Sequence, residues 1–186
     1  LQAFGQSFDC SPVSVKLADD IENIWGDSFS IHVKKKDDPK IYGCGASKGG
    51  QLGVGDTEDY LGELKPVIYS ETDLPIENIK EVFYGGYSRA NQIFYLTNDG
   101  EVYGSGRLGK YVHGETTSTY VFRNIHVFST FEARKQAVLI YSNQDEPAKK
   151  VIPHSLFSIS ILTENKNLYV RGFVSAISNN IENSYV

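Results

Sequence analysis

Residues 43–56 read Gly-Cys-Gly-Ala-Ser-Lys-Gly-Gly-Gln-Leu-Gly-Val-Gly-Asp, and this glycine-rich stretch is the most informative part of the sequence. A dinucleotide-binding loop with similar glycines must open a helix inside a βαβ unit. Here the pair Gly49-Gly50 is followed by Gln-Leu-Gly-Val-Gly-Asp, which is poor in helix formers, and no Gly-Lys-Ser/Thr occurs in the chain. We therefore interpret residues 45–56 as a structural loop, in which glycines let neighbouring backbones approach closely.

The segment that leads into this loop recurs along the chain. Four short apolar stretches end in glycine, at residues 1–5, 41–45, 102–106 and 168–172. Three of them follow a hairpin-type turn, at residues 37–40, 98–101 and 164–167. The tetrapeptide Ile-Glu-Asn-Ile also returns, at 21–24 and again at 76–79. The glycine-ended stretches start 40, 61 and 66 residues apart and the tetrapeptides 55 residues apart, and a recurrence at such intervals is typical of a repeat architecture.

The repeats predict an all-β fold. Short segments rich in Val, Ile, Tyr and Phe alternate with turn residues, which favours strands over helices. Each repeat is predicted to form a four-stranded antiparallel sheet, and radial stacking of such sheets into a β-propeller would bury their apolar faces. We predict a partial β-propeller of about three and a half blades. Its units are 1–20 (half a blade), 21–75, 76–135, 136–180 and 181–186 (the start of the next). The predicted strands are 13–17, 29–33, 41–44, 66–69, 93–96, 102–105, 120–127, 138–141, 157–162 and 168–170.

The loop resembles the signature of the regulator of chromosome condensation family of seven-bladed propellers. That signature is a Trp-Gly pair, a polar spacer and Gly-Gln-Leu-Gly-x-Gly, and here Cys44-Gly45 stands at the Trp-Gly position. A degenerate copy follows in the second unit at residues 106–115, and the third unit keeps only Leu168, Tyr169 and Gly172. The predicted structural signature comprises Gly43, Gly45, Gly50, Gln51, Leu52, Gly53, Gly55, Asp56, Gly106, Gly109, Gly114 and Gly172.

The bulk composition narrows the range of partners. The chain has 186 residues, a formal net charge of -5 and a pI of about 5.4, which argues against direct nucleic-acid binding. The basic run at 34–36 leads directly into Asp37-Asp38 and is interpreted as a solvated turn.

No apolar run is long enough to span a bilayer, and no signal peptide is visible. The chain has only two cysteines, Cys10 and Cys44, which favours a reducing intracellular compartment. A single disulfide between them is the alternative. The predicted location is the cytoplasm, with the nucleus and the cilium or cytoskeleton as alternatives.

No motif in the sequence supports an enzyme. The four histidines, at 32, 113, 126 and 154, lack metal-ligand spacing, so neither a metal nor a cofactor is predicted. His32 lies in a predicted strand and is interpreted as a packed residue. Ser88, in Gly-Tyr-Ser-Arg-Ala, falls one residue short of a nucleophile elbow and lacks its strand-to-helix context. A hydrolase site at Ser88 is the weakest of the readings.

Candidate partner-binding residues come from an alignment of Ile24, Ile79 and Leu139. On that alignment the linker to the next strand lengthens from 25–28 to 80–92 and then to 140–157, and insertions at one position open onto one face of a propeller. Such a segment is either a tolerated surface loop or a binding loop. The candidates are Tyr84, Tyr87 and Arg89 in the second linker, with Asn143, Asp145, Glu146 and Lys149 in the third.

The predicted function is a non-catalytic protein-interaction or scaffold propeller, as a subunit or segment of a larger assembly. The alternative comes from the resemblance, because the founding member of that family is a guanine-nucleotide exchange factor for a Ran-like small GTPase. Residues 142–153 could act as the inserted wedge, although no residue-level match supports that role. The predicted partners are proteins, such as a small GTPase or a cytoskeletal or ciliary assembly. Because the chain has no Met and its repeats start in mid-unit, we also expect a part of a larger propeller, with its outer edges covered.

Overall fold

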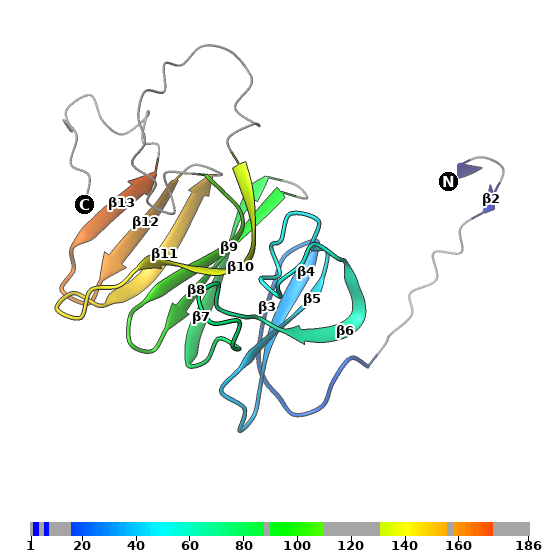
Figure 1. Ribbon diagram of the computed structural model, residues 1–186, viewed down its shortest axis with the longest axis horizontal. Coiled ribbons are helices and arrows are strands. Elements are labelled where there is room, and N and C mark those ends of the chain that lie inside the picture. The colour runs from blue at the N-terminus through cyan, green and yellow to red at the C-terminus, as the bar shows by residue number, and fades with distance from the viewer. Residues whose placement is uncertain are drawn as a thin grey trace, which may run out of the picture.

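A computed structural model describes residues 2–3, 6–7, 16–87, 90–109, 131–155 and 158–172. This part of the chain contains strands and turns and no helix. Two four-stranded sheets and one three-stranded sheet stand side by side, with the second sheet in the middle (Figure 1). All their neighbouring strands are antiparallel, which confirms the predicted all-β, blade-like architecture.

The three sheets follow the order of the sequence. In each of them the strands are added one after another, so that consecutive strands are neighbours. A separate two-stranded hairpin, β1 (Gln2–Ala3) with β2 (Gln6–Ser7), precedes them. The first sheet is β3 (Ile21–Gly26), β4 (Ser30–Lys35), β5 (Ile41–Gly45) and β6 (Tyr60–Pro66); the second is β7 (Ile79–Tyr87), β8 (Ala90–Thr97), β9 (Val102–Gly109) and β10 (Phe131–Tyr141); the third is β11 (Ala148–Ser155), β12 (Ser158–Thr163) and β13 (Leu168–Gly172).

The predicted hairpins are confirmed at the same place in each sheet. Turns join β4 to β5, β8 to β9 and β12 to β13, and each contains a backbone hydrogen bond between residues three apart. These bonds run from Asp38 N to Lys35 O, from Gly100 N to Thr97 O and from Lys166 N to Thr163 O. The turn chemistry seen in the sequence therefore does mark one recurring structural position.

The strand register aligns the three sheets residue by residue. The closing glycines Gly45, Gly106 and Gly172 lie opposite Ser30, Gln92 and Ser158. The first strand of each sheet has a register shift near its start, directly after Ile21, Ile79 and Ala148 respectively. Those three residues are therefore equivalent, and the alignment of Ile24 with Ile79 and Leu139 is wrong. Leu139 belongs instead to β10, which crosses the expected unit boundary between 135 and 136.

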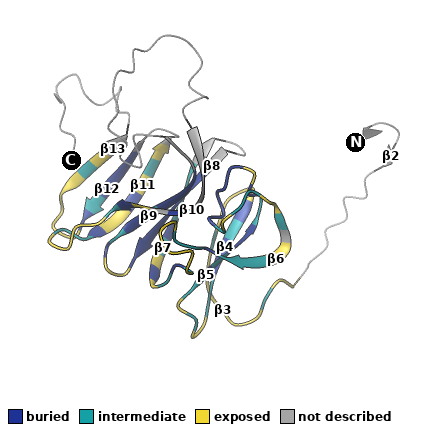
Figure 2. Ribbon diagram, viewed as in Figure 1, coloured by how far each residue is buried: buried dark blue, intermediate teal, exposed yellow. Residues whose placement is uncertain are grey.

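Two apolar clusters fill the two spaces between the sheets. One joins the first and second sheets around Ile41, Ile79, Val82 and Tyr95. The other joins the second and third sheets around Phe94, Val102 and Ile159. Strand β8 lies between them, with alternate side chains facing opposite clusters, and residues 92–97 are all buried (Figure 2). This explains the uninterrupted apolar run at 93–96, because a strand covered on both faces has no solvent-facing side.

Candidate functional site

The glycine-rich loop folds into the space between the first two sheets. Gln51 and Leu52 are fully buried, and the Gln51 Oε1 accepts a hydrogen bond of 2.8 Å from the Gly49 amide. Gly53 has a positive φ of 71°, and a Cβ there would lie 3.0 Å from Val67 and 3.1 Å from the Tyr95 hydroxyl. At the end of the loop, the Asp56 carboxylate accepts hydrogen bonds from the Glu58 amide and the Tyr60 hydroxyl. The loop therefore closes on its own backbone and packs against β8.

A buried polar cluster joins this loop to both sheets. It consists of His32, Tyr84, Tyr95 and Ser105, together with the backbone carbonyls of residues 51 and 52. The His32 Nδ1 lies 2.8 Å from the Tyr84 hydroxyl, and its Nε2 lies 3.2 Å from the Tyr95 hydroxyl. Ser105 donates to the Gln51 carbonyl over 2.7 Å, and Tyr84 donates to the Trp25 carbonyl over 3.1 Å. Each side chain of the cluster thus bridges two segments that are distant in sequence.

The electrostatics of the cluster keep its members uncharged. Burial lowers the pKa of His32 from 6.5 to about 4, against the opposing effects of the Leu52 carbonyl and Asp27. Burial also raises the pKa of Tyr95 and of Tyr84 far above the ordinary tyrosine value. A neutral imidazole donates one hydrogen bond and accepts one, which matches the two tyrosine hydroxyls that flank it. The cluster is therefore a clamp between sheets, with no group held ready to exchange a proton near neutral pH.

Sequence reasoning predicted the burial of His32 but missed the rest of the clamp. Trp25 and Glu81 were also missed; the Trp25 indole donates to the Glu81 carboxylate over 2.6 Å between the first and second sheets. The available signal was weak, because these residues lie 52 to 63 positions apart. Only a residue-by-residue alignment of the repeats could have predicted that these residues meet.

The expected growth of the linkers is wrong. Most of 80–92 belongs to strands β7 and β8, which pair as far as Tyr87 and Ala90. The counterparts of that pair are Gly26 with Ile31 in the first sheet and Ser155 with Ser158 in the third. Tyr84 lies within β7 and is committed to the clamp, whereas Tyr87 ends that strand. Arg89, like Ser88 and Gly114, lies outside the described residues.

The other candidates lie at the opposite end of the sheets. Residues 142–147 connect β10 to β11 beside the hairpin turns, so they do not share a face with the Tyr87 end of β7. Asn143 accepts a hydrogen bond from the Asp145 amide, and the Glu146 carboxylate accepts hydrogen bonds from Asn167 and Tyr169. Lys149, in β11, pairs with Glu164 at 3.3 Å. The connection is thereby fastened to the third sheet, and partner binding by these residues stays a prediction.

The remaining signature glycines and the cysteine take structural positions. Gly43 lies against His32 and Leu52, and Gly50 and Gly55 have positive φ. Cys44 is buried, with its thiol 3.0 Å from the Tyr60 carbonyl. Gly106 lies at the strand position equivalent to Gly45, and Gly109 pairs with Phe131 in β10.

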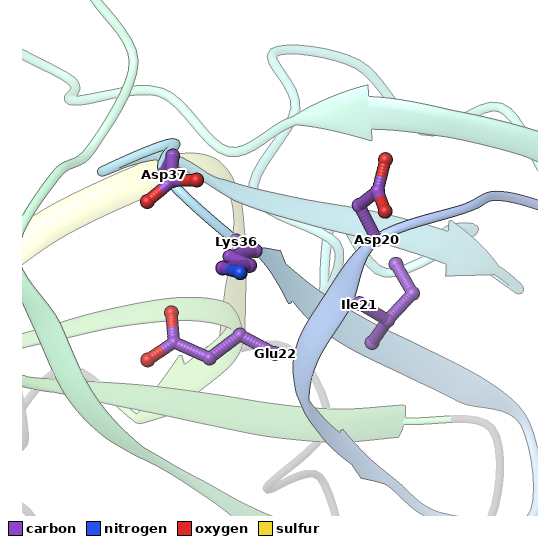
Figure 3. A pocket seen from close by; sticks show the side chains of 5 residues that line it. All are labelled: Asp20, Ile21, Glu22, Lys36 and Asp37. Atoms are coloured by element: carbon purple, nitrogen blue, oxygen red, sulfur yellow. The ribbon is translucent and has the colours of Figure 1, made fainter.

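One surface hollow lies at the base of the first sheet. It has a volume of about 530 Å³ and is lined by Asp20, Ile21, Glu22, Lys36 and Asp37, which stand around its mouth in Figure 3. All five residues are exposed, so the hollow is open to solvent. Among the described residues, no group of three or more His, Cys, Asp or Glu side chains could hold a metal ion. No helix in the described part of the chain is long and apolar enough to cross a membrane.

Comparison with known proteins shows the fold. No known family profile matches the sequence, and no curated protein sequence does. Solved structures do match. Human WBSCR16 superposes with a TM-score of 0.56 at 13% identity, over 82% of this chain and 33% of that one. Yeast RCC1 (Prp20), solved with Kap60, superposes with a TM-score of 0.57 at 20% identity, over 83% of this chain and 32% of that one. Prp20p from Saccharomyces cerevisiae, described with its binding to Gsp1p and histones, superposes with a TM-score of 0.57 at 22% identity. The match covers 83% of this chain and 33% of that one.

The chain therefore has the fold of part of an RCC1-like β-propeller, which is the fold that the glycine-rich loop suggested. It spans about one third of the length of each of these proteins. At these identities the likeness concerns the fold, and function has to be argued from this chain's own residues.

Proposed function

We propose that this chain is a segment of a non-catalytic propeller that holds protein partners on its rigid ends. The observation that carries the proposal is the clamp, which ties the signature loop to both sheets through His32, Tyr95 and Ser105. Apart from the contact between Tyr95 and Ser105 within the second sheet, its hydrogen bonds join one sheet to the other or a sheet to the loop, so these groups serve rigidity. A rigid stack of sheets with connections at its two ends is a platform of the kind that propellers provide.

The likeness to Prp20p supports a protein partner. One structure of Prp20 was solved with Kap60, and another is described with binding to Gsp1p and histones. The connection at 142–147 carries the exposed residues Asn143 and Asp145 on a fastened backbone. A preordered loop loses little entropy when a partner binds. We place the partner at this end of the sheets, and we propose an intracellular location.

The test is a binding experiment with the native chain. Immobilised chain is exposed to a Gsp1p-type GTPase, a Kap60-type carrier and core histones, with wild type compared to an Asn143→Ala/Asp145→Ala variant. Binding that the double substitution weakens supports the proposed surface. Binding that it leaves unchanged, or no binding to any of the three at about 10 μM, contradicts the proposal. Lys48→Ala is the control, because Lys48 is also exposed and lies on the glycine-rich loop.

Nucleotide exchange on a Ran-like GTPase is the second candidate, favoured by the described binding of Prp20p to Gsp1p. Release of a fluorescent guanine nucleotide from such a GTPase measures it directly. Release above the intrinsic rate, slowed by the Asn143→Ala/Asp145→Ala substitutions, supports exchange. Release at the intrinsic rate rejects it and leaves the scaffold function standing.

A further inference from the structure

Each of the two outer sheets exposes an apolar face that the repeat register marks as an interface. We call the face turned toward the preceding sheet the entry face, and the face turned toward the following sheet the exit face. The entry faces of the second and third sheets are buried, and so are the exit faces of the first and second. The entry face of the first sheet and the exit face of the third have no neighbouring sheet in the described part of the chain.

The entry face of the first sheet carries the same positions as the buried ones. Ile24 lies opposite Val33, as Val82 lies opposite Tyr95 and Val151 opposite Ile161. Val82 and Val151 are buried between sheets at 5% and 1% exposure, whereas Ile24 is 60% exposed. Its neighbour Ile21, the counterpart of Ile79, is also exposed.

The exit face of the third sheet shows the same contrast. Leu168 lies opposite Leu162, as Val102 lies opposite Leu96 in the second sheet. Val102 is fully buried in the cluster between the second and third sheets, whereas Leu168 is 64% exposed. Ile152, the counterpart of Phe83, and Val170 extend the exposed apolar surface on this side.

We infer that these two faces bind each other, so that the entry face of one copy of this chain packs on the exit face of a second copy. This choice of partner follows from the two interfaces already present between the sheets. In both of them the entry face of one sheet covers the exit face of the preceding sheet. A second copy continues that arrangement with the same register. The contact is head-to-tail and therefore heterologous, which permits closure of a ring from whole copies.

The first test is the mass of the chain in solution, by light scattering over a range of concentrations. We expect a species at a whole multiple of the 20.7 kDa chain, and about tenfold or more weaker association for Ile24→Lys and for Leu168→Lys. Leu74→Lys is the matched control, because Leu74 is 62% exposed on the loop between the first two sheets. Circular dichroism confirms that each variant is folded. A wild-type chain that stays monomeric up to about 100 μM overturns the inference.

Mixing the variants tests the head-to-tail geometry. The Ile24→Lys chain keeps an intact exit face and the Leu168→Lys chain an intact entry face, so an equimolar mixture should form a two-chain species that neither forms alone. In a Cys10→Ser background, Ile24→Cys and Leu168→Cys chains should form a disulfide together. Cross-linking of Ile24→Cys to itself, or no pairing in the mixture, overturns the proposed arrangement.

Discussion

At the scale of single residues, one repeat position is filled in three ways. His32, Phe94 and Ser160 occupy the same register position in the three sheets. Phe94 packs in an apolar cluster, and Ser160 contacts His154. His32 instead meets the carbonyl of Leu52, because only the first sheet has the complete glycine-rich loop over that position. The loop thus determines which side chain the position accepts, because a polar side chain is needed beside the buried Leu52 carbonyl and the Tyr95 hydroxyl.

The buried His32 makes stability depend on pH. Its pKa of about 4 in the folded chain lies below the ordinary 6.5, so the unfolded chain binds the proton more tightly. The contribution of neutral His32 to the unfolding free energy is therefore complete above pH 6.5. It falls as the pH drops toward 4 and is lost below that. Between pH 7.5 and pH 4.5 we expect this histidine to cost about 2 to 3 kcal/mol of unfolding free energy.

Urea unfolding at several pH values measures that loss, with His32→Phe as the comparison because Phe stands at the equivalent position 94. The variant should lose less stability than wild type over this pH range, since carboxylates contribute equally to both. Parallel pH profiles for the two proteins would show that His32 is not the group responsible.

Gly45 tests the requirement for glycine at the closing position. Its φ is 118°, and a Cβ there would lie 2.5 Å from the Phe29 carbonyl oxygen. Gly45→Ala should therefore cost about 3 kcal/mol, from backbone strain and steric overlap together. Gly62→Ala is the control, because Gly62 also has a positive φ of 94° but open space around it, and should cost about 1 kcal/mol. Equal losses in denaturant unfolding would remove steric overlap as the cause.

At the scale of elements, the sequence predicted every interior strand of the three sheets and missed four of their six edge strands. Strands β4, β5, β8, β9 and β12 lie inside their sheets, and each was predicted in part. The edge strands β3, β6, β7 and β11 were not among the predicted strands, whereas the edge strands β10 and β13 were predicted in part. An edge strand tolerates charges and proline, as in Lys149, Lys150 and Pro153 of β11, so its composition resembles that of a loop.

This difference also explains the misplaced candidate surface. Because β7 and β11 were taken for linkers, their residues were assigned to long loops on one face. In the structure Tyr87 lies at one end of the sheets and the 142–147 connection at the other. The predicted strand 13–17 lies partly outside the described residues, and the predicted strand 120–127 lies wholly outside them. The predicted strand 66–69 shares only Pro66 with β6.

The close approach of β7 and β11 gives a test of packing between sheets. A Cβ at Gly85 would overlap the Pro153 ring. Gly85→Ala should destabilise the chain by about 1 to 3 kcal/mol, because the two edge strands would have to separate. Pro153→Gly should relieve that overlap, so a double-mutant cycle should show a favourable coupling of about 1 kcal/mol. Additive losses in the cycle would indicate that the two strands do not meet at these residues.

At the scale of the whole molecule, the two apolar clusters are linked through one strand. Side chains of β8 enter both clusters, so the loss of either one exposes this strand. Stacked repeats interact with their neighbours only, and a shared strand strengthens that coupling. The described sheets should therefore unfold together.

Trp25, the only tryptophan, reports on this cooperativity from the first interface. We expect the urea transitions followed by its fluorescence and by far-ultraviolet circular dichroism to coincide, as in two-state unfolding. A fluorescence transition at clearly lower urea would mean that the first sheet separates before the others unfold. The Leu74→Lys chain serves as the control, since its substitution lies outside both clusters.

Reading the sequence alone was enough to predict the repeat, the strand class and the hairpin turns, while the purely structural role of the glycine-rich loop stays a prediction. Those features depend on local chemistry: β-favouring side chains, turn residues and glycines each act within a few positions. The register between sheets, the clamp around His32 and the faces left exposed at Ile24 and Leu168 emerged from the three-dimensional fold. The clamp contacts that join the first two sheets link residues more than 50 positions apart, and a slip of a few residues in aligning the repeats moves every such contact.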